Sequence, residues 1–251
     1  AAAGGIRVEK PGNRSVSSKS GAADVLECLG VRLDLTPEQA EAVLEQTGMC
    51  FLFAPAYHSS MKYAAPVRRE IGIRSIFNIL GPLSNPANAS MQLLGVYSRK
   101  LVQPLAQVLA NLGVTRGMAV CGGDGLDEAT LTGPTHVCEI RFGELTSYDI
   151  TPKELGLSPC APEDLKGGTP EENAQITRDI LSGTLTGPKK DVVVLNSALS
   201  LYLGTDHCTV RDCIRTAREL IESGAAFQKM EEFAAASRMA AGEEKGTDDA
   251  G

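Results

Sequence analysis

The chain has 251 residues, of which 43% are hydrophobic and 22% charged, a composition typical of a globular chain with one large domain or two small ones. Its formal net charge of −7 argues against general nucleic-acid binding, and it has no apolar run near the ~20 residues that a membrane helix needs. The odd number of cysteines and the absence of a Cys-x-x-Cys pair disfavour a disulfide framework or a zinc knuckle and fit a reducing compartment.

The chain begins with a short predicted strand, Ile6-Arg7-Val8, followed by a polar segment at residues 10–21. This segment combines glycines, serines, an amide and cations, and the apolar spacing after it predicts a helix from Ala22. Glycine allows close approach of the backbone to a ligand, and a helix N-terminus adds unpaired N–H groups. These features suit a phosphate-binding loop, although an ordinary polar loop capped by Ser20 explains them equally well.

Three Thr-Pro steps predict helix starts, because each places Thr at the cap, Pro at the first helical position and Gln or Glu two residues later. They begin at Thr36, Thr151 and Thr169. Apolar residues at helical spacing predict further helices around residues 101–112 and 214–221. The predicted strands are Met49–Phe53, Gln92–Tyr97, Met118–Cys121, Val137–Arg141, Ser147–Ile150 and Val192–Leu195. Strands and helices alternate, so we expect an α/β fold.

A second basic segment lies at residues 62–74, close to His58. On one continuous helix His58 and Arg68 would lie on about the same face. A solvated charged face and a structural histidine are the plain alternatives. Residues 77–86 contain a glycine and two prolines, which indicate a tightly fixed corner.

A glycine-rich turn with three carboxylates follows the apolar strand at residues 118–121. It does not match a dinucleotide-binding fingerprint, because Glu128 stands at the third glycine position, and it does not match the EF-hand pattern. Adjacent Asp127 and Glu128 are hard oxygen ligands of the kind that Mg²⁺ prefers. An acidic surface turn without a metal is the alternative.

Several of these segments, in the same order, resemble the anthranilate phosphoribosyltransferase family. The family motif K-H-G-N-R-x-x-S-S-x-S-G, with the helix A-D-V-L-E-x-L-G after it, is similar to residues 10–30. Residues 53–58, 66–74, 78–86, 122–128 and 172–174 are similar to further family segments. The resemblance extends from about residue 6 to about residue 237.

The resemblance implies two substrates and one metal ion, with electrostatic and positioning catalysis rather than a nucleophilic side chain. The residues implied for 5-phosphoribosyl 1-diphosphate (PRPP) are Lys10, Gly12, Asn13, Arg14, Ser15, Val16, Ser17, Ser18 and Ala22, the last through its backbone. Those implied for anthranilate are Asn13, His58, Arg68 and Pro82. Asp127 and Glu128 are implied to hold Mg²⁺ against the diphosphate.

The fold implied is an α/β domain with a central mixed sheet flanked by helices, similar to nucleoside phosphorylases, with a remnant of a small helical domain. We expect a catalytic domain at residues 1–237, with about 56–82 contributing to the helical part, and a disordered acidic tail at 238–251. Two departures stand out. Pro11 replaces the family histidine, and the family's G-T-G-G-D loop and N-x-S-T segment are missing. We therefore expect a fragment that lacks about the first quarter of the enzyme.

Other readings stay open at this stage. They are a catalytically impaired fragment, a related pyrimidine nucleoside phosphorylase, and a non-enzymatic relative that binds nucleic acid. The resemblance implies anthranilate and PRPP as partners, with no nucleic acid and no membrane. It also implies a homodimer for the full-length protein, doubtful for this chain, and a bacterial cytoplasm or a plastid as the location. We expect Lys10 and Asp127 to face a shared cleft.

Overall fold

The computed structural model describes residues 1–14, 20–57, 81, 83, 87 and 89–242. The chain folds as two compact units. One consists of Ala1 with Ser75–Lys166 and Asp179–Gly224, and the other of Ala2–Arg74, Gly167–Arg178 and Ala225–Gly251.

The first unit contains a four-stranded sheet with the order β3-β4-β5-β6. The strands are β3 (Met91–Gly95), β4 (Arg116–Gly122), β5 (Thr135–Arg141) and β6 (Glu144–Ile150). β3 and β4 are parallel and are joined by helix α6 (Arg99–Asn111), whereas β4, β5 and β6 form an antiparallel meander. The sheet is therefore mixed, with one crossover connection.

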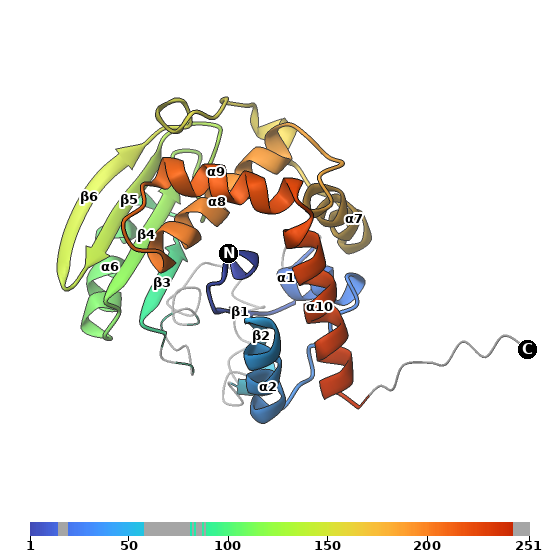
Figure 1. The fold of residues 1–251 in the computed structure, drawn as a ribbon. Coiled ribbons are helices and arrows are strands. Elements are labelled where there is room, and N and C mark those ends of the chain that lie inside the picture. Colours follow the sequence, from blue (N-terminus) through green and yellow to red (C-terminus); the bar gives the residue numbers. More distant parts are fainter. Residues whose placement is uncertain (15–19, 58–80, 82, 84–86, 88, 243–251) are drawn as a thin grey trace, which may run out of the picture. The chain divides into compact units, whose positions relative to one another are not determined.

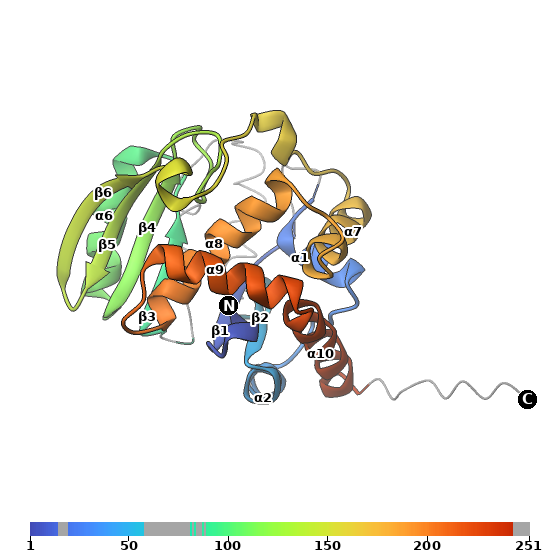
Figure 2. The same cartoon turned by 45° about the horizontal axis from the view of Figure 1, so that its top comes forward.

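Helices cover both faces of this sheet (Figures 1 and 2). Ala119 and Cys121 of β4 belong to the same buried cluster as Leu105 and Leu109 of α6. Side chains alternate along a strand, so Met118, which is fully buried, points to the opposite face, where α8 (Pro188–Gly204) packs. Helix α9 (Val210–Glu222) packs on α8, and the 3₁₀ turns η2 (Lys153–Leu155) and η3 (Pro162–Leu165) precede α8. β4 is thus buried on both sides, which explains its continuous apolar sequence.

The second unit is built on a two-stranded parallel sheet, β1 (Val8–Gly12) with β2 (Met49–Phe53). The remaining elements are η1 (Ala2–Gly4), α1 (Ala22–Cys28), α2 (Pro37–Thr47), α3 (Ala54–Tyr57) and α10 (Ala225–Ala240), and α7 (Pro170–Leu181) begins in this unit. Helix α10 packs along α2 (Figure 1). Val43, Phe51 and Phe233 meet in the buried core, so segments nearly two hundred positions apart in the chain close this unit.

Two of the three Thr-Pro predictions are confirmed, since α2 begins at Pro37 and α7 at Pro170. The third is wrong in extent. Glu154 does accept a hydrogen bond from the Thr151 N–H at 3.0 Å, but only the 3₁₀ turn η2 follows. Gly156, with φ of 75°, adopts the left-handed conformation and ends the turn.

The predicted strand Val192–Leu195 is wrong, because these residues lie inside α8. A short apolar run has no period that separates a strand from a buried helix. Here Pro188 stands at the first helical turn and apolar residues continue to Leu203. The strand predicted at residues 6–8 is displaced as well. β1 begins at Val8 and continues through Gly12, so that the first residues of the polar segment are strand and not loop.

The α/β class with helices flanking sheets is confirmed, and the described strands form two sheets. α10 continues to Ala240, past the expected boundary at residue 237, and residues 243–251 lie outside the described part. All seven cysteines are free thiols. Among the described helices, none combines the length and apolar character required to cross a membrane.

Replacing Thr36 by alanine should lower the free energy of unfolding by about 1 kcal/mol, the usual effect of losing a helix cap. The Gln39 N–H donates to Thr36 Oγ1 at 3.3 Å, and the Thr36 N–H donates to the Gln39 side chain at 2.8 Å. Urea unfolding measures the change. Thr36→Ser keeps the hydroxyl and should retain most of the stability, so equal midpoints for the Ala and Ser variants would contradict this role.

Candidate functional site

The basic segment begins within β1, where Lys10 is the exposed middle residue of the strand. Within the described part of the chain, the Lys10 ammonium forms no hydrogen bond or ion pair. Gly12 is required for packing, because a Cβ at this position would lie 2.6 Å from the ring of Phe51. The strand therefore carries a cation two residues before a backbone position that has no side chain, an arrangement suited to a phosphate group.

Arg14 is held by acidic residues of α1. Its guanidinium donates to both carboxylate oxygens of Glu27, one of them at 2.6 Å, and lies 3.6 Å from Asp24. The hydrogen bond to Glu27 is the main reason that the pKa of Arg14 is raised. The guanidinium also lies 5.6 Å from the centre of the Phe53 ring. A phosphate that binds Arg14 would therefore have to replace a carboxylate.

The first turn of α1 is capped differently from the prediction, since the N-cap is Gly21 and not Ser20. The Gly21 N–H donates to the Asp24 carboxylate at 2.9 Å. Ala22, predicted to contact PRPP through its backbone, is the first and exposed residue of this short helix. The Asn13 side chain accepts a hydrogen bond from the Arg14 N–H at 2.8 Å, which fixes the turn after β1.

The acidic turn lies at the carboxyl end of β4, as predicted. Asp127 and Glu128 are both exposed. Among the described residues, no hydrogen bond or ion pair engages the Asp127 carboxylate. The main chain of Asp127 packs directly on Gly95, the last residue of β3, where an added Cβ would overlap the Asp127 carbonyl oxygen. The neighbouring strand end thus determines where the turn can lie.

The third carboxylate of the turn, Asp124, has an internal role. It accepts hydrogen bonds from the Thr130 hydroxyl at 2.7 Å, the Leu126 N–H at 3.1 Å and the Thr132 hydroxyl. Partial burial alone would raise the pKa of Asp124, but the hydrogen bonds from Thr132, Thr130 and Leu126 outweigh it and hold the pKa below its usual value. Asp124 therefore stays ionised and ties the two ends of the turn together.

Helix α8 holds the end of the turn. The Ala129 N–H donates to the Asn196 side-chain oxygen at 3.0 Å, and the Asn196 amide donates to the Ala129 carbonyl at 2.9 Å. The same amide donates to the Val192 carbonyl at 3.0 Å. Ala129, the residue directly after Glu128, is fully buried. Asp127 and Glu128 are thus exposed carboxylates on a fixed backbone, which fits a Mg²⁺ ion that takes its remaining ligands from substrate and water.

Neutralising Asp124 should weaken the protein in a way that depends on pH. The carboxyl has a lower pKa folded than unfolded, so its contribution to stability is complete above the unfolded pKa of about 4 and disappears as the pH falls through the folded pKa. Asp124→Asn should therefore unfold at lower urea than the wild type at pH 7, with a smaller difference below pH 4. Urea unfolding across this range tests it, and a difference that is constant with pH would contradict the assignment.

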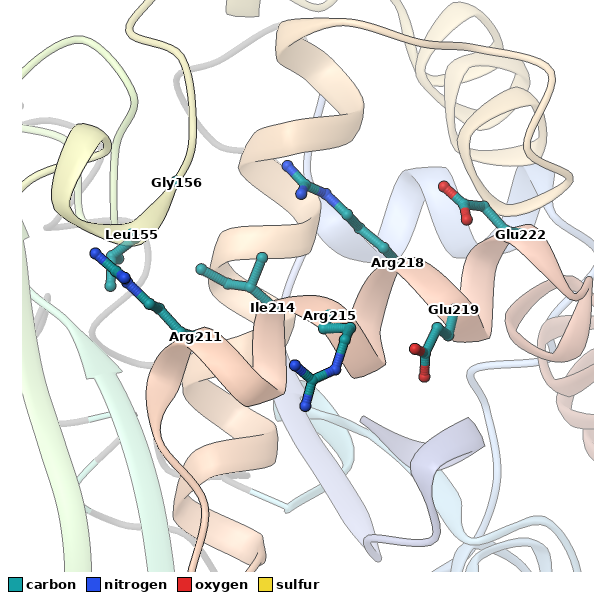
Figure 3. A pocket seen from close by; sticks show the side chains of 8 residues that line it. All are labelled: Leu155, Gly156, Arg211, Ile214, Arg215, Arg218, Glu219 and Glu222. Carbon is teal, nitrogen blue, oxygen red and sulfur yellow. The ribbon is translucent and has the colours of Figure 1, made fainter.

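A separate pocket of about 530 Å³ lies along α9 and is lined by Arg211, Arg215 and Arg218 (Figure 3). These arginines already have acceptors within the protein. Arg211 donates to the Glu154 carbonyl, Arg215 lies 3.0 Å from Asp212, and Arg218 lies 3.5 Å from Asp191. Their side chains leave the helix in different directions (Figure 3). We therefore take the basic segment and the acidic turn, each within its own unit, as the candidate functional segments in place of this pocket.

Of the predicted site residues, the structure describes Lys10, Gly12, Asn13, Arg14, Ala22, Asp127 and Glu128. Seven others lie outside the described residues, namely Ser15, Val16, Ser17, Ser18, His58, Arg68 and Pro82. Sequence reasoning missed Gly95 and Asn196, both of which fix the acidic turn. A glycine at the end of an apolar strand was a signal for the first, and the sequence near Asn196 gave none.

Comparison with known proteins assigns the chain to a family. Residues 1–227 match the glycosyl transferase family, a/b domain. The anthranilate phosphoribosyltransferase of Ruminiclostridium cellulolyticum is 56% identical over 231 residues, which cover 92% of this chain and 67% of that protein. This chain belongs to the anthranilate phosphoribosyltransferase family.

Other family members agree. The enzyme of Endomicrobium trichonymphae is 56% identical over 94% of this chain and 70% of its own length. The crystal structure from Thermus thermophilus has a TM-score of 0.89 at 43% identity and covers 94% of this chain and 70% of that one. The Saccharomyces cerevisiae structure in complex with PRPP and Mg has a TM-score of 0.86 at 28% identity, covering 95% and 68%. This chain thus spans somewhat over two thirds of the length of these family members.

Proposed function

We propose that this chain transfers the phosphoribosyl group of PRPP to the amine of anthranilate and releases diphosphate, a step of tryptophan biosynthesis. The observation that carries the proposal is the 56% identity with an anthranilate phosphoribosyltransferase over 92% of the chain. The exposed, rigidly held Asp127 and Glu128 add support, because a diphosphate substrate needs a metal partner. A homodimer and a cytoplasmic location stay predictions.

The residues described above take the following roles in this proposal. Lys10, Asn13 and Arg14, with the serines at positions 15, 17 and 18, contact the phosphate groups of PRPP, as do the backbones of Gly12, Val16 and Ala22. Arg14 exchanges its bond to Glu27 for one to phosphate. His58, Arg68 and Pro82, with Asn13, contact anthranilate, and Arg68 pairs with its carboxylate. Asp127 and Glu128 hold Mg²⁺.

The chemistry asks for orientation and charge stabilisation. Anthranilate's amine is neutral at pH 7 and needs no strong base to free its lone pair. As its nitrogen bonds to ribose C1, the bond from C1 to the diphosphate oxygen breaks and that oxygen takes the electron pair. The nitrogen then gives up one proton to the released diphosphate or to water. Bound Mg²⁺ supplies charge neutralisation on the leaving diphosphate. Lys10 and Arg14 lower the energy of the anionic groups, and fixing both substrates removes much of the entropic barrier.

A direct assay tests the proposal. The chain should consume anthranilate, followed by its fluorescence, only when PRPP and Mg²⁺ are both present, and excess EDTA should stop the reaction. Thymidine with inorganic phosphate serves as the comparison substrate pair. Phosphorolysis of thymidine without consumption of anthranilate would overturn the proposal in favour of a nucleoside phosphorylase.

A further inference from the structure

We infer that Asn196 is a positioning residue for the Mg²⁺-binding carboxylates, an inference that rests on the function proposed above. Asn196 touches neither substrate nor metal in this assignment. Its side-chain amide accepts a hydrogen bond from the Ala129 N–H at 3.0 Å and donates one to the Ala129 carbonyl at 2.9 Å. Ala129 directly follows Glu128. Asn196 lies in the middle of α8, and the neighbouring side chains Leu195 and Leu199 are fully buried. The helix that carries the amide is therefore fixed by packing.

The orientation of the Asn196 amide is determined by its partners. The Ala129 N–H needs an acceptor, whereas the carbonyls of Ala129 and Val192 need donors. Only the observed arrangement of the amide oxygen and nitrogen satisfies all three groups. Ala129 is fully buried, so water cannot take over these bonds, and losing them would release the end of the acidic turn.

Replacing Asn196 by aspartate gives the most specific test, because aspartate has nearly the same shape but offers two acceptor oxygens and no donor. One oxygen of the Asn196→Asp variant still accepts from the Ala129 N–H. The other meets the carbonyl oxygens of Ala129 and Val192, which repel it. Asn196→Ala removes the hydrogen bonds to Ala129 without adding charge. Ser200→Ala is the matched control, since Ser200 lies one turn further along α8 and its hydroxyl donates to the Asn196 carbonyl at 3.2 Å, away from the acidic turn.

Two measurements test the inference. The first is the Mg²⁺ concentration that gives half-maximal turnover with saturating PRPP and anthranilate. The second is Mn²⁺ binding in the presence of PRPP, followed by electron paramagnetic resonance, which needs no turnover. Asn196→Asp should weaken both by about ten-fold or more, the usual effect of losing a residue that orients a metal ligand. The KM for anthranilate should stay within about two-fold, and Ser200→Ala should match the wild type.

Other results would overturn the inference. One is unchanged Mn²⁺ binding in folded Asn196→Asp. Another is an equal loss of turnover at every Mg²⁺ concentration, which would mark a merely structural residue. If the aspartate variant does not fold, Asn196→Ala decides by the same measurements. Failure of the proposed function looks different, because the wild type itself would then show no Mg²⁺-dependent consumption of anthranilate.

A second observation is independent of the acidic turn. The thiols of Cys208 and Cys213 lie 3.2 Å apart at the start of α9. Thr209 is the N-cap, so the two cysteines stand one position before the cap and at the fourth helical position, where apolar side chains commonly pack against each other. Cys213 is buried, and Cys208 is half-buried and open to small reagents.

We propose that this pair is a modification site that forms an intrachain disulfide with a small disulfide such as oxidised glutathione. The Cys208 sulfur attacks one sulfur of the reagent, forming a mixed disulfide and releasing one reduced glutathione. Cys213 then attacks the Cys208 sulfur and releases the second, so the two thiols give up two hydrogens in all. The sulfur atoms need to approach by about 1 Å to reach the bond length of ~2.05 Å.

Trypsin offers a clean test, because its cleavage after Arg211 separates the two cysteines. After treatment of the folded chain with oxidised glutathione, the peptides that end at Arg211 and Arg215 should stay joined until a reductant is added. Cys28 is exposed and serves as the internal control, which should carry a glutathione adduct instead. In Cys213→Ser, Cys208 should also carry the adduct. Adducts on Cys208 of the wild type, or joining of Cys208 to any other cysteine, would overturn the proposal.

Discussion

Replacing Asp127 by asparagine and Glu128 by glutamine together should reduce turnover about a thousand-fold. A loss of this size equals about 4 kcal/mol of transition-state stabilisation, within the several kcal/mol that a metal supplies to a departing anion. Both side chains are exposed, and the backbone beneath them is held by Asp124, Gly95 and Asn196. The neutral amides should therefore keep the turn in place while losing affinity for Mg²⁺.

The double variant should bind anthranilate almost as the wild type does, since none of the residues proposed for that substrate is changed. Anthranilate fluorescence gives the binding curve, and release of diphosphate gives turnover. Glu231→Gln with Glu232→Gln is the control, because it also removes two negative charges, here from exposed residues of α10 that pair with Arg178 and Lys229. Turnover of the Asp127 and Glu128 variant close to that of the control would refute the metal role of the pair.

Local features of the sequence predicted several helices and strands of the fold correctly. The Thr36 capping box predicted the start of α2, and an unbroken apolar run predicted β2 with its observed bounds. In both places the structure follows from residues that are neighbours in the chain. The acidic turn was also predictable, because glycines and carboxylates directly after an apolar strand specify a turn at its end.

The features that the sequence did not predict depend instead on residues far apart in the chain or on packing in the folded protein. Val192–Leu195 lacks any local feature that separates strand from helix, and burial against the sheet decides for α8. The ion pair of Arg14 with Glu27 could not be read from the sequence, because it depends on how α1 returns towards β1. Asn196 lies 67 positions from Ala129, so its hydrogen bonds to the acidic turn form only in the folded chain. The ligand types were thus predictable, whereas the groups that hold them were not.

Replacing Gly95 by alanine should lower activity strongly, although it adds a single methyl group. The new Cβ would overlap the Asp127 carbonyl oxygen and lie 2.6 Å from the Asp127 carbonyl carbon. Main-chain atoms cannot rotate away as a flexible side chain can, so β3 or the acidic turn must shift. Gly95 lies in a regular strand and alanine fits its backbone, which leaves the collision with Asp127 as the cause of any effect.

A displacement of about 1 Å in a positioning group lowers turnover about a hundred-fold, and we expect that loss for Gly95→Ala. The overpacking should also reduce the free energy of unfolding by about 1–3 kcal/mol, which urea unfolding measures. Gly133→Ala is the matched control, because a Cβ at that position meets no atom within 4 Å. If Gly95→Ala kept its Mg²⁺ requirement and turnover at the level of Gly133→Ala, the contact with Asp127 would not position the carboxylates. The expected result would mean that Gly95, through its close contact with the Asp127 main chain, positions the carboxylates of Asp127 and Glu128, although it has no side chain of its own.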